Sequence, residues 1–468
     1  MVMQSINPAT EEVLETFQEH TPQEVESALD QVYEKQKQWR TTSFAERTAG
    51  LMSLARVLRE NKAAFAGTIT AEMGKPIVEA EAEVEKCAWN CEYYAQNAER
   101  FVTPEPADIG VTESYVAFEP LGVVLAIMPW NFPFWQVIRF LAPALMAGNT
   151  AILKHASNVP KAALSIEQAV KQAGLPDGVF RTLLVPGSKV EPLIGDPRIA
   201  AITLTGSSEV GERVASTAGR HLKKQVLELG GSDPFVVLAD ADLNAAATTA
   251  ARARNQNSGQ SCIASKRFIV EESVADEFVE RFSEAVSAMR VGDPSARETN
   301  VGPLARPDLR ETLIAQVDAS LNRGAKAIIG GKAIDRRGYF YAPTVLDGVS
   351  LDMPAFREET FGPVAAVVRV KDPDEAVTLA NDTEYGLGAA LWTSDLERAK
   401  LLARRIEAGA VFVNGMVASD PRMPFGGVKR SGYGRELGAF GIREFTNIQT
   451  VVMNASSGPT VAPKPAAD

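Results

Sequence analysis

Short apolar runs alternate with helical stretches from about residue 121 onward, and this alternation constrains the fold of the chain more than any other feature. Each run has the length of a buried strand, and amphipathic stretches of helical spacing separate the runs. Buried strands that alternate with helices indicate βαβ units and a parallel, doubly wound sheet of the α/β class. The expected strands cover residues 123–127, 151–153, 180–185, 200–204 and 226–229, and the expected helices cover 133–146, 159–172 and 209–218.

A second α/β stretch begins near residue 234 and is expected to form a separate unit, because 468 residues exceed what one hydrophobic core supports. Before residue 121 the pattern is mainly helical. Thr21 and Ser43 each begin a capping box, in which a hydroxyl residue is followed three positions later by glutamate. Residues 456–468 are rich in Ala, Pro and Ser and are expected to be a disordered tail. The second stretch is expected to have helices over 243–254, 274–289 and 308–321, and later strands over 364–370 and 410–413.

The composition argues against several classes of protein. A formal net charge of −11 argues against a nucleic acid or an anionic membrane as the main partner, and it requires a local cation if the substrate is an anion. Three cysteines and three histidines are too few for a disulfide framework, a histidine-rich metal site or a Ser-His-Asp triad. Residues 1–10 lack the segments of a secretory signal, and the apolar run 121–130 is about half the length of a membrane span. A cytoplasmic protein without a metal is expected.

Cys262 ends a loop of small and polar residues, Ser258-Gly259-Gln260-Ser261-Cys262, with no histidine or second cysteine close in sequence. Most lone cysteines are buried structural thiols. However, small residues let a ligand approach the backbone, and loops often carry catalytic residues. A free thiol has a pKa of about 8.5, so a nucleophilic Cys262 needs a carboxylate base or oriented backbone amides to assist it.

Glu228 is the single charge in the apolar run 226–229, which ends in Gly230-Gly231. Two interpretations stay open. A buried carboxyl group would have a raised pKa and suit a general base, whereas a carboxylate at the strand end would simply face water.

Three further motifs accompany Cys262 and Glu228. Asn131 follows an expected strand and precedes an expected helix, which puts an amide at a strand end. The segment Gly-Ser-Ser-Glu-Val-Gly at 206–211 follows another strand and suits phosphate binding at a helix N-terminus, although it is not G-x-G-x-x-G. The segment Glu-Glu-Thr-Phe-Gly-Pro at 358–363 places acids and an aromatic ring on a loop.

These five motifs occur in the order in which NAD(P)-dependent aldehyde dehydrogenases carry them, and the chain resembles that superfamily from about residue 6 to about residue 453. The stretches 227–235 and 425–432 are most similar to bacterial short-type succinate-semialdehyde dehydrogenases. The resemblance implies the aldehyde-dehydrogenase-like fold, with a cofactor-binding domain over 1–111 and 121–228 and a catalytic domain over 229–428. It also implies a β-hairpin oligomerisation arm over 112–120 and 429–455, and therefore a homodimer or homotetramer.

The resemblance also implies roles for single residues. Cys262 is similar to the nucleophile that forms a thiohemiacetal, and the Asn131 amide, with the backbone N–H of Cys262, is similar to the oxyanion site. Hydride transfer to the nicotinamide leaves a thioacyl-enzyme, and Glu228 resembles the base that activates water for its hydrolysis. Glu359 and Phe361 resemble the residues that hold the nicotinamide ribose and ring. The other residues similar to cofactor-binding positions are Trp130, Asn131, Lys154, Gly206, Ser207 and Leu229.

The segment Lys154-His155-Ala156-Ser157 departs from the pattern of NAD-preferring members, which tend to carry glutamate three residues after the lysine. A glutamate there accepts hydrogen bonds from the ribose 2′-hydroxyl and repels a 2′-phosphate. Ser157 can instead donate a hydrogen bond to a phosphate, and Lys154 is already a cation. The four residues are therefore expected to bind the cofactor with a preference for NADP over NAD.

Arg139 lies eight residues after Asn131, about two helical turns along one helix. It is similar to the arginine that binds the substrate carboxylate in succinate-semialdehyde dehydrogenases. Its apolar neighbours indicate an isolated charge that faces a cleft, and an ordinary ion-pairing arginine is the alternative. Ser419 is expected to add a hydroxyl donor and Trp135 to wall the substrate tunnel. A second arginine that some of these enzymes carry six residues before the nucleophile is replaced by Gln256.

Other functions stay open beside the oxidation of succinate semialdehyde to succinate. The nearest alternative is a dehydrogenase for another ω-acid or aliphatic aldehyde, such as glutarate semialdehyde. A CoA-acylating enzyme is disfavoured because such enzymes usually lack the glutamate that Glu228 matches. A binding protein that kept the fold is disfavoured by the joint presence of Cys262, Glu228 and Asn131, and a cofactor-free thiol esterase would need no dinucleotide cleft.

Overall fold

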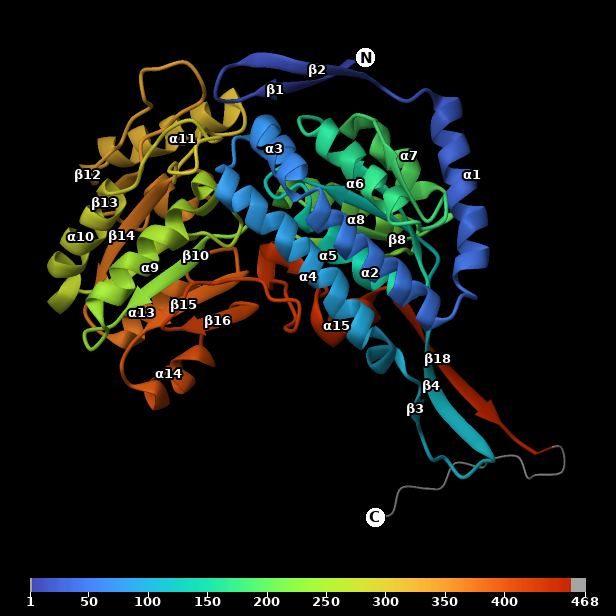
Figure 1. The fold of residues 1–468 in the computed structure, drawn as a ribbon. Helices are drawn as coiled ribbons and strands as arrows, with labels where there is room; N and C mark the ends of the chain where they lie inside the picture. Colours follow the sequence, from blue (N-terminus) through green and yellow to red (C-terminus); the bar gives the residue numbers. More distant parts are fainter. Residues whose placement is uncertain (1, 456–468) are drawn as a thin grey trace.

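The computed structural model describes residues 2–455, and its core consists of two large sheets with helices packed against them (Figure 1). The six-stranded sheet has the spatial order β17 (Gly432–Tyr433), β9 (Lys224–Glu228), β8 (Ile199–Thr205), β5 (Val123–Met128), β6 (Thr150–His155) and β7 (Phe180–Leu183). Strands β9 to β7 in this order are parallel, and β17 pairs antiparallel with β9. The chain adds β6 and β7 on one side of β5 and β8 and β9 on the other. The carboxyl ends of β5 and β8 therefore flank a switch point, where α/β sheets bind ligands.

Side chains of this sheet alternate between two cores, which is why its strands read as continuous apolar runs. Val124 and Ala126 belong to a core shared with α2 to α6, whereas Val123 and Leu125 belong to a core shared with α1, α7 and α8. The predicted doubly wound α/β sheet is thus confirmed. The helices are α1 (Pro22–Trp39), α2 (Phe44–Glu60), α3 (Lys62–Met73), α4 (Ile77–Val102), α5 (Trp135–Met146), α6 (Pro160–Gln172), α7 (Val190–Gly195) and α8 (Ser208–Arg220).

A seven-stranded sheet forms the second α/β unit, in the order β12 (Lys326–Ile329), β13 (Thr344–Asp347), β14 (Val364–Val370), β11 (Ser265–Glu271), β10 (Asp233–Val237), β15 (Gly388–Trp392) and β16 (Ala410–Val413). All neighbours are parallel except β12 and β13. Phe235 and Phe268 face a core with α9 (Leu243–Asn255) and α10 (Glu272–Ser287), whereas Val236 and Ile269 face α13 (Pro373–Asn381) and α14 (Leu396–Ala403). Helices α11 (Pro307–Asn322) and α12 (Pro354–Arg357) pack with β13 and β14 in a further core.

Both expected capping boxes are present, at the starts of α1 and α2. At α1 the Glu24 N–H donates to Thr21 Oγ1 at 3.2 Å, and the Thr21 N–H donates to Glu24 Oε2 at 2.7 Å. A hairpin of β1 (Val2–Asn7) and β2 (Glu12–Gln18) precedes α1. The sequence pattern does not predict this hairpin, because most side chains of β2 are exposed and do not alternate.

A three-stranded sheet of β3 (Glu105–Pro106), β4 (Glu113–Pro120) and β18 (Thr446–Met453) projects from the body of the molecule (Figure 1). The expected arm covers 112–120 and 429–455, and in the second segment the residues that join this sheet are those of β18. The residues before it belong to the body, since β17 extends the six-stranded sheet and α15 (Gly438–Glu444) packs against α4 and α5. None of the helices in residues 2–455 is both long and apolar enough to span a membrane. The expected tail, 456–468, lies outside the described residues.

Candidate active site

Cys262 lies where two cavities meet, of about 290 and about 410 Å³, and it lines both together with Gln136. Its loop follows the 3-10 turn η2 (Gln256–Gly259) and leads into β11. The loop packs closely on the residues after β9, because a Cβ atom at Gly231 would lie 2.5 Å from the carbonyl oxygen of Cys262. The carboxyl end of β9 and the amino end of β11 therefore bring the two α/β units together at the thiol.

The backbone before Cys262 is held in an unusual conformation. Asn257, Ser258 and Gly259 have φ values of 56°, 55° and 75°, in the left-handed region that non-glycine residues rarely adopt. A Cβ atom at Gly259 would lie 2.2 Å from the carbonyl oxygen of Gly362, so no other residue fits there. The Asn257 N–H donates to Glu79 Oε2 at 2.7 Å. Such strain costs about 1–3 kcal/mol for each non-glycine residue and is typical of functional sites.

A buried cation holds the other side of the loop. Lys266 is fully buried, and its Nζ donates to the carbonyl oxygens of Ser261, Cys262 and Ala264 at 3.1, 3.0 and 3.1 Å. These three bonds use all the donors of an ammonium group. Lys266 Nζ also lies 3.8 Å from Glu359 Oε1. The ammonium group therefore fixes the loop and brings a positive charge near the thiol.

Burial raises the pKa of the Cys262 thiol to about 12, although the positive charges of Lys266 and Arg139 act in the opposite direction. The thiol is therefore protonated at neutral pH in this structure. Attack on a carbonyl group requires a base to take its proton.

Asn131 lies beside Cys262 in the larger cavity. Its Nδ2 donates to the carbonyl oxygen of Gln260 at 3.1 Å, and its Oδ1 accepts from Gln136 Nε2 at 3.1 Å. The Asn131 carbonyl also accepts from Asn257 Nδ2 at 2.8 Å. These bonds orient the amide against the loop of Cys262. Because Nδ2 carries two hydrogens, it can donate the second one to a bound oxyanion.

Glu228 ends β9 with its side chain 2% exposed, which agrees with the buried interpretation rather than the one facing water. Its carboxyl group forms no hydrogen bond with a described residue and does not line either cavity beside Cys262. Burial and, after it, the nearby Glu436 carboxylate raise the pKa of Glu228 well above its usual value. The positive charges of Arg139 and Arg435 act in the opposite direction. Burial therefore favours the protonated carboxyl group, which lies outside both cavities that Cys262 lines.

The larger cavity lies at the carboxyl ends of β5, β8 and β9 and beside the start of α8, where backbone N–H groups attract phosphate. The rings of Trp130 and Phe361 meet edge to face at a centroid distance of 5.8 Å and form its apolar wall. Glu359 Oε1 accepts from the Gly231 N–H at 3.0 Å. This combination fits a dinucleotide, with phosphates at the helix and a planar ring near the thiol. The predicted residues that line this cavity are Trp130, Asn131, Gly206, Ser207, Leu229, Glu359 and Phe361.

The segment 154–157 lies at the same edge of the sheet, where β6 pairs with β5, but outside the lining of that cavity. Lys154 is buried, and burial lowers the pKa of its ammonium group. His155 Nε2 lies 2.9 Å from the carbonyl oxygen of Pro133, so its ring contacts the turn before α5. Burial lowers the pKa of His155 to about 4, which keeps it neutral. Ser157 is exposed at the end of the segment.

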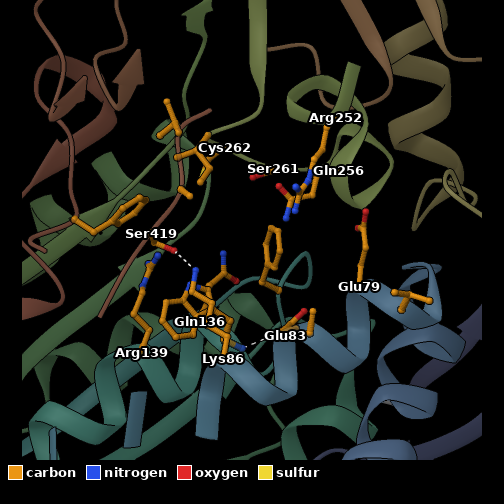
Figure 2. A pocket seen from close by; sticks show the side chains of 18 residues that line it. Glu79, Glu83, Lys86, Gln136, Arg139, Arg252, Gln256, Ser261, Cys262 and Ser419 are labelled. Atoms are coloured by element: carbon orange, nitrogen blue, oxygen red, sulfur yellow. Dashed lines mark hydrogen bonds between the residues drawn. The ribbon is translucent and has the colours of Figure 1, made fainter. Parts of the chain in front are cut away.

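The smaller cavity brings Cys262 together with the predicted Arg139, Trp135 and Ser419 (Figure 2). The expectation that Arg139 is an isolated charge is wrong. Its guanidinium group forms a buried ion pair with Glu436, lies 4.9 Å from the centroid of the Phe425 ring and donates to Thr205 Oγ1 at 3.3 Å. The sequence pattern misses this pairing because Glu436 lies far along the chain.

A model of the aldehyde dehydrogenase family matches residues 1–451. The probable succinate-semialdehyde dehydrogenase [NADP(+)] of Synechocystis sp. is 51% identical over 451 residues, 96% of this chain and 99% of that protein. Succinate-semialdehyde dehydrogenase [NADP(+)] 1 of Mycobacterium tuberculosis is 50% identical over 454 residues, with the same coverage of both chains. This chain belongs to the aldehyde dehydrogenase family. A crystal structure of succinic semialdehyde dehydrogenase from Streptococcus pyogenes in complex with NADP+ is similar in fold, with a TM-score of 0.94, 38% identity, and 97% and 100% of the two chains covered.

The sequence analysis does not predict three residues of this aldehyde dehydrogenase site, which are Lys86, Gln136 and Lys266. Lys86 lines the smaller cavity from α4, a helix whose charged pattern reads as solvated scaffold. Lys266 looks like an ordinary polar residue at a strand start, although it is fully buried. The one available signal is Lys266-Arg267 directly before the apolar run of β11, because charges next to a buried strand need partners.

Proposed function

We propose that this aldehyde dehydrogenase oxidises succinate semialdehyde to succinate with NADP+ through a covalent intermediate on Cys262. The observation that carries the proposal is the position of Cys262 between two cavities. Lys86, Arg139 and Arg252 are among the residues that line one of them, and the other lies beside the start of α8. The relatives at 50–51% identity that are named succinate-semialdehyde dehydrogenase [NADP(+)] support this choice of substrate and cofactor.

In the first step Cys262 loses its proton to solvent water, and Sγ of the thiolate forms a bond with the aldehyde carbon. The π electrons of the carbonyl group move to its oxygen and give the thiohemiacetal oxyanion. The free N–H of the Asn131 amide and the backbone N–H of Cys262 donate to this oxygen. Donors that are already oriented stabilise a developing charge without reorganisation, and the bonds of Asn131 to Gln260 and Gln136 supply that orientation.

Bound NADP+ supplies the acceptor for the hydride that leaves the former aldehyde carbon. Cys262 then holds the succinyl group as a thioester. Glu228 turns from its buried position beside Glu436 toward the thioester and loses its proton to solvent, since leaving that position removes the repulsion by Glu436 that contributes to its raised pKa. The carboxylate takes a proton from water, the water oxygen attacks the thioester carbon, and the C–S bond breaks to give succinate.

We also propose which residues bind the cofactor. Glu359 and Phe361 hold the nicotinamide ribose and ring, and Lys154 and Ser157 hold the ribose 2′-phosphate, which favours NADP over NAD. The remaining contacts come from Trp130, Asn131, His155, Ala156, Gly206, Ser207 and Leu229.

We also propose that residues 1–111 and 121–228 form the cofactor-binding domain and 229–428 the catalytic domain. The enzyme is cytoplasmic and assembles as a homodimer or homotetramer through the arm of β4 and β18. The exposed side chains of Ile448, Val452 and Met453 on the edge strand β18 support this role. Unpaired edge strands with apolar side chains are typical of surfaces that pair with another chain.

The test is to incubate the purified protein with succinate semialdehyde and NADP+ and to measure NADPH and succinate. The proposal predicts equal amounts of both products and no reaction for Cys262→Ala. Glutarate semialdehyde as a parallel substrate distinguishes the nearest alternative, because a higher kcat/KM for the longer acid would reassign the substrate. Absence of NADPH with either aldehyde would refute the dehydrogenase assignment.

A further inference from the structure

Lys86 projects from α4 into the smaller cavity, which Cys262 also lines. Its Nζ donates to Ser419 Oγ at 2.7 Å and lies 4.3 Å from the centroid of the Trp135 ring. Figure 2 shows Lys86, Arg139 and Ser419 grouped on one side of the cavity, with Glu79 and Arg252 on the other. Three residues from α4, α5 and the segment after β16 thus form one polar corner.

The ammonium group of Lys86 forms no ion pair within residues 2–455, although two carboxylates lie near it. Both of these carboxylates have their own cations. Glu83 is ion-paired with Lys75, and its Oε1 also accepts the Trp135 N–H at 3.0 Å. Asp420 is ion-paired with Arg422 at 2.7 Å. The positive charge of Lys86 is therefore left for a ligand.

Arg139 differs from Lys86 in this respect, because its charge is balanced by Glu436. A substrate carboxylate that approached Arg139 alone would compete with a carboxylate that is already bound and buried. Moreover, Gln256 lines the same cavity and is neutral. In a protein of net charge −11, the local cation that an anionic substrate requires is best supplied by Lys86.

We propose that Lys86, together with Ser419, binds the carboxylate of the substrate and so sets the preference for an acid aldehyde. This inference rests on the proposed function, and Lys86 is its specificity-determining residue. Ser419 Oγ accepts a hydrogen bond from Lys86, which leaves its O–H free to donate to a carboxylate oxygen. The face of the Trp135 ring holds the ammonium group and keeps water from one side of it.

Arg252 offers a matched control. It lines the same cavity and forms no ion pair within the described residues, but it is exposed and lies on the opposite side, beside Glu79 (Figure 2). Arg252→Met therefore removes one positive charge from the cavity without touching the corner of Lys86 and Ser419.

The experiment measures kcat/KM with NADP+ for succinate semialdehyde and for uncharged butyraldehyde, in the wild type, Lys86→Met and Arg252→Met. Lys86→Met is expected to lower the ratio of the two values at least about tenfold, since a hydrogen bond to a charged group is lost. The loss should be in KM for the acid aldehyde. Arg252→Met should leave the ratio close to that of the wild type. An unchanged ratio in Lys86→Met would overturn the inference.

A binding measurement covers a variant with little turnover. Succinate should protect Cys262 from alkylation by iodoacetamide, and Lys86→Met should raise the succinate concentration for half protection at least about tenfold. Equal protection of wild type and Lys86→Met would overturn the inference. If the wild type oxidises both aldehydes equally while Lys86→Met still loses protection by succinate, the proposed substrate is wrong and the carboxylate site stands.

Discussion

The guanidinium group of Arg139 is ion-paired with the carboxylate of Glu436, and the two side chains are only 4% and 1% exposed. The pair joins α5 to the segment just before α15, and the carboxyl group of Glu228 is its neighbour. Arg139 therefore balances a buried charge next to the proposed base, whatever it contributes to the substrate. This separates it from Lys86, whose charge faces the cavity.

Replacing one partner of this pair should destabilise the protein strongly. Glu436→Gln leaves a buried guanidinium group without its counter-charge, which costs about 3–5 kcal/mol, whereas the double replacement Arg139→Met/Glu436→Leu should cost less than either single change. Thermal unfolding followed by calorimetry gives the order of the Tm values. Glu81→Gln, which breaks the exposed pair with Arg297, should leave Tm nearly unchanged. A double variant less stable than both single variants would contradict this account.

Glu228→Gln should lower kcat about 10²–10⁴-fold, the usual contribution of a general base. Its Tm should stay close to that of the wild type, because the carboxyl group forms no hydrogen bond with a described residue that the amide would break. Rapid mixing with NADP+ and succinate semialdehyde should still give a burst of NADPH, since Glu228 acts after hydride transfer. A variant without the burst would place Glu228 in an earlier step.

Ser157→Glu should change the cofactor preference. The new carboxylate repels a ribose 2′-phosphate and accepts hydrogen bonds from a 2′-hydroxyl, so kcat/KM should fall at least about tenfold with NADP+ and fall less or rise with NAD+. Because Ser157 is exposed, the replacement should leave Tm unchanged. Ser157→Ala is the control that removes the hydroxyl without adding charge. Equal losses with both cofactors would remove Ser157 from the cofactor site.

The preference for the acid aldehyde should depend on pH. Burial and, after it, the positive charge of Arg139 lower the pKa of Lys86 to about 8. Cys87, Asp420 and Glu83 act in the opposite direction. The cationic form, which binds a carboxylate, is present below that pH and is lost above it. The kcat/KM ratio of succinate semialdehyde to butyraldehyde, in which the titration of Cys262 cancels, should therefore fall above about pH 8. In Lys86→Arg, whose guanidinium group keeps its proton, the ratio should stay flat.

The sequence predicts the five parallel strands of the six-stranded sheet, because strands buried on both faces leave continuous apolar runs, but it does not predict β17. The seven-stranded sheet is harder to predict. The second and third residues of its strand β11 are Lys266 and Arg267, which are fully buried, and charged residues rarely indicate a buried strand. Arg267 is satisfied by the carbonyl oxygens of Ser232, Leu379 and Ala380, at 2.9, 2.7 and 2.9 Å, and no local pattern announces these partners.

Some residues of the candidate site are likewise predicted from the sequence, and others are not. Cys262 and Asn131 are predicted from local motifs, and both lie at the junction of the cavities. Glu436 contributes to the raised pKa of Glu228 and forms the ion pair of Arg139, although it lies about 200 and 300 residues away from them along the chain. Lys86 enters the site because α4 packs against α5. Contacts of this kind depend on tertiary packing, which periodicity and spacing do not encode.

The most direct test of the central claim is mass spectrometry of Glu228→Gln after incubation with succinate semialdehyde and NADP+. Slow hydrolysis should let the thioester accumulate, so a succinyl group should be found on the peptide that contains Cys262, and it should depend on NADP+. Its position reports the nucleophile, the substrate and the order of the steps together. A variant that forms NADPH but carries no succinyl group on Cys262 would contradict the covalent mechanism.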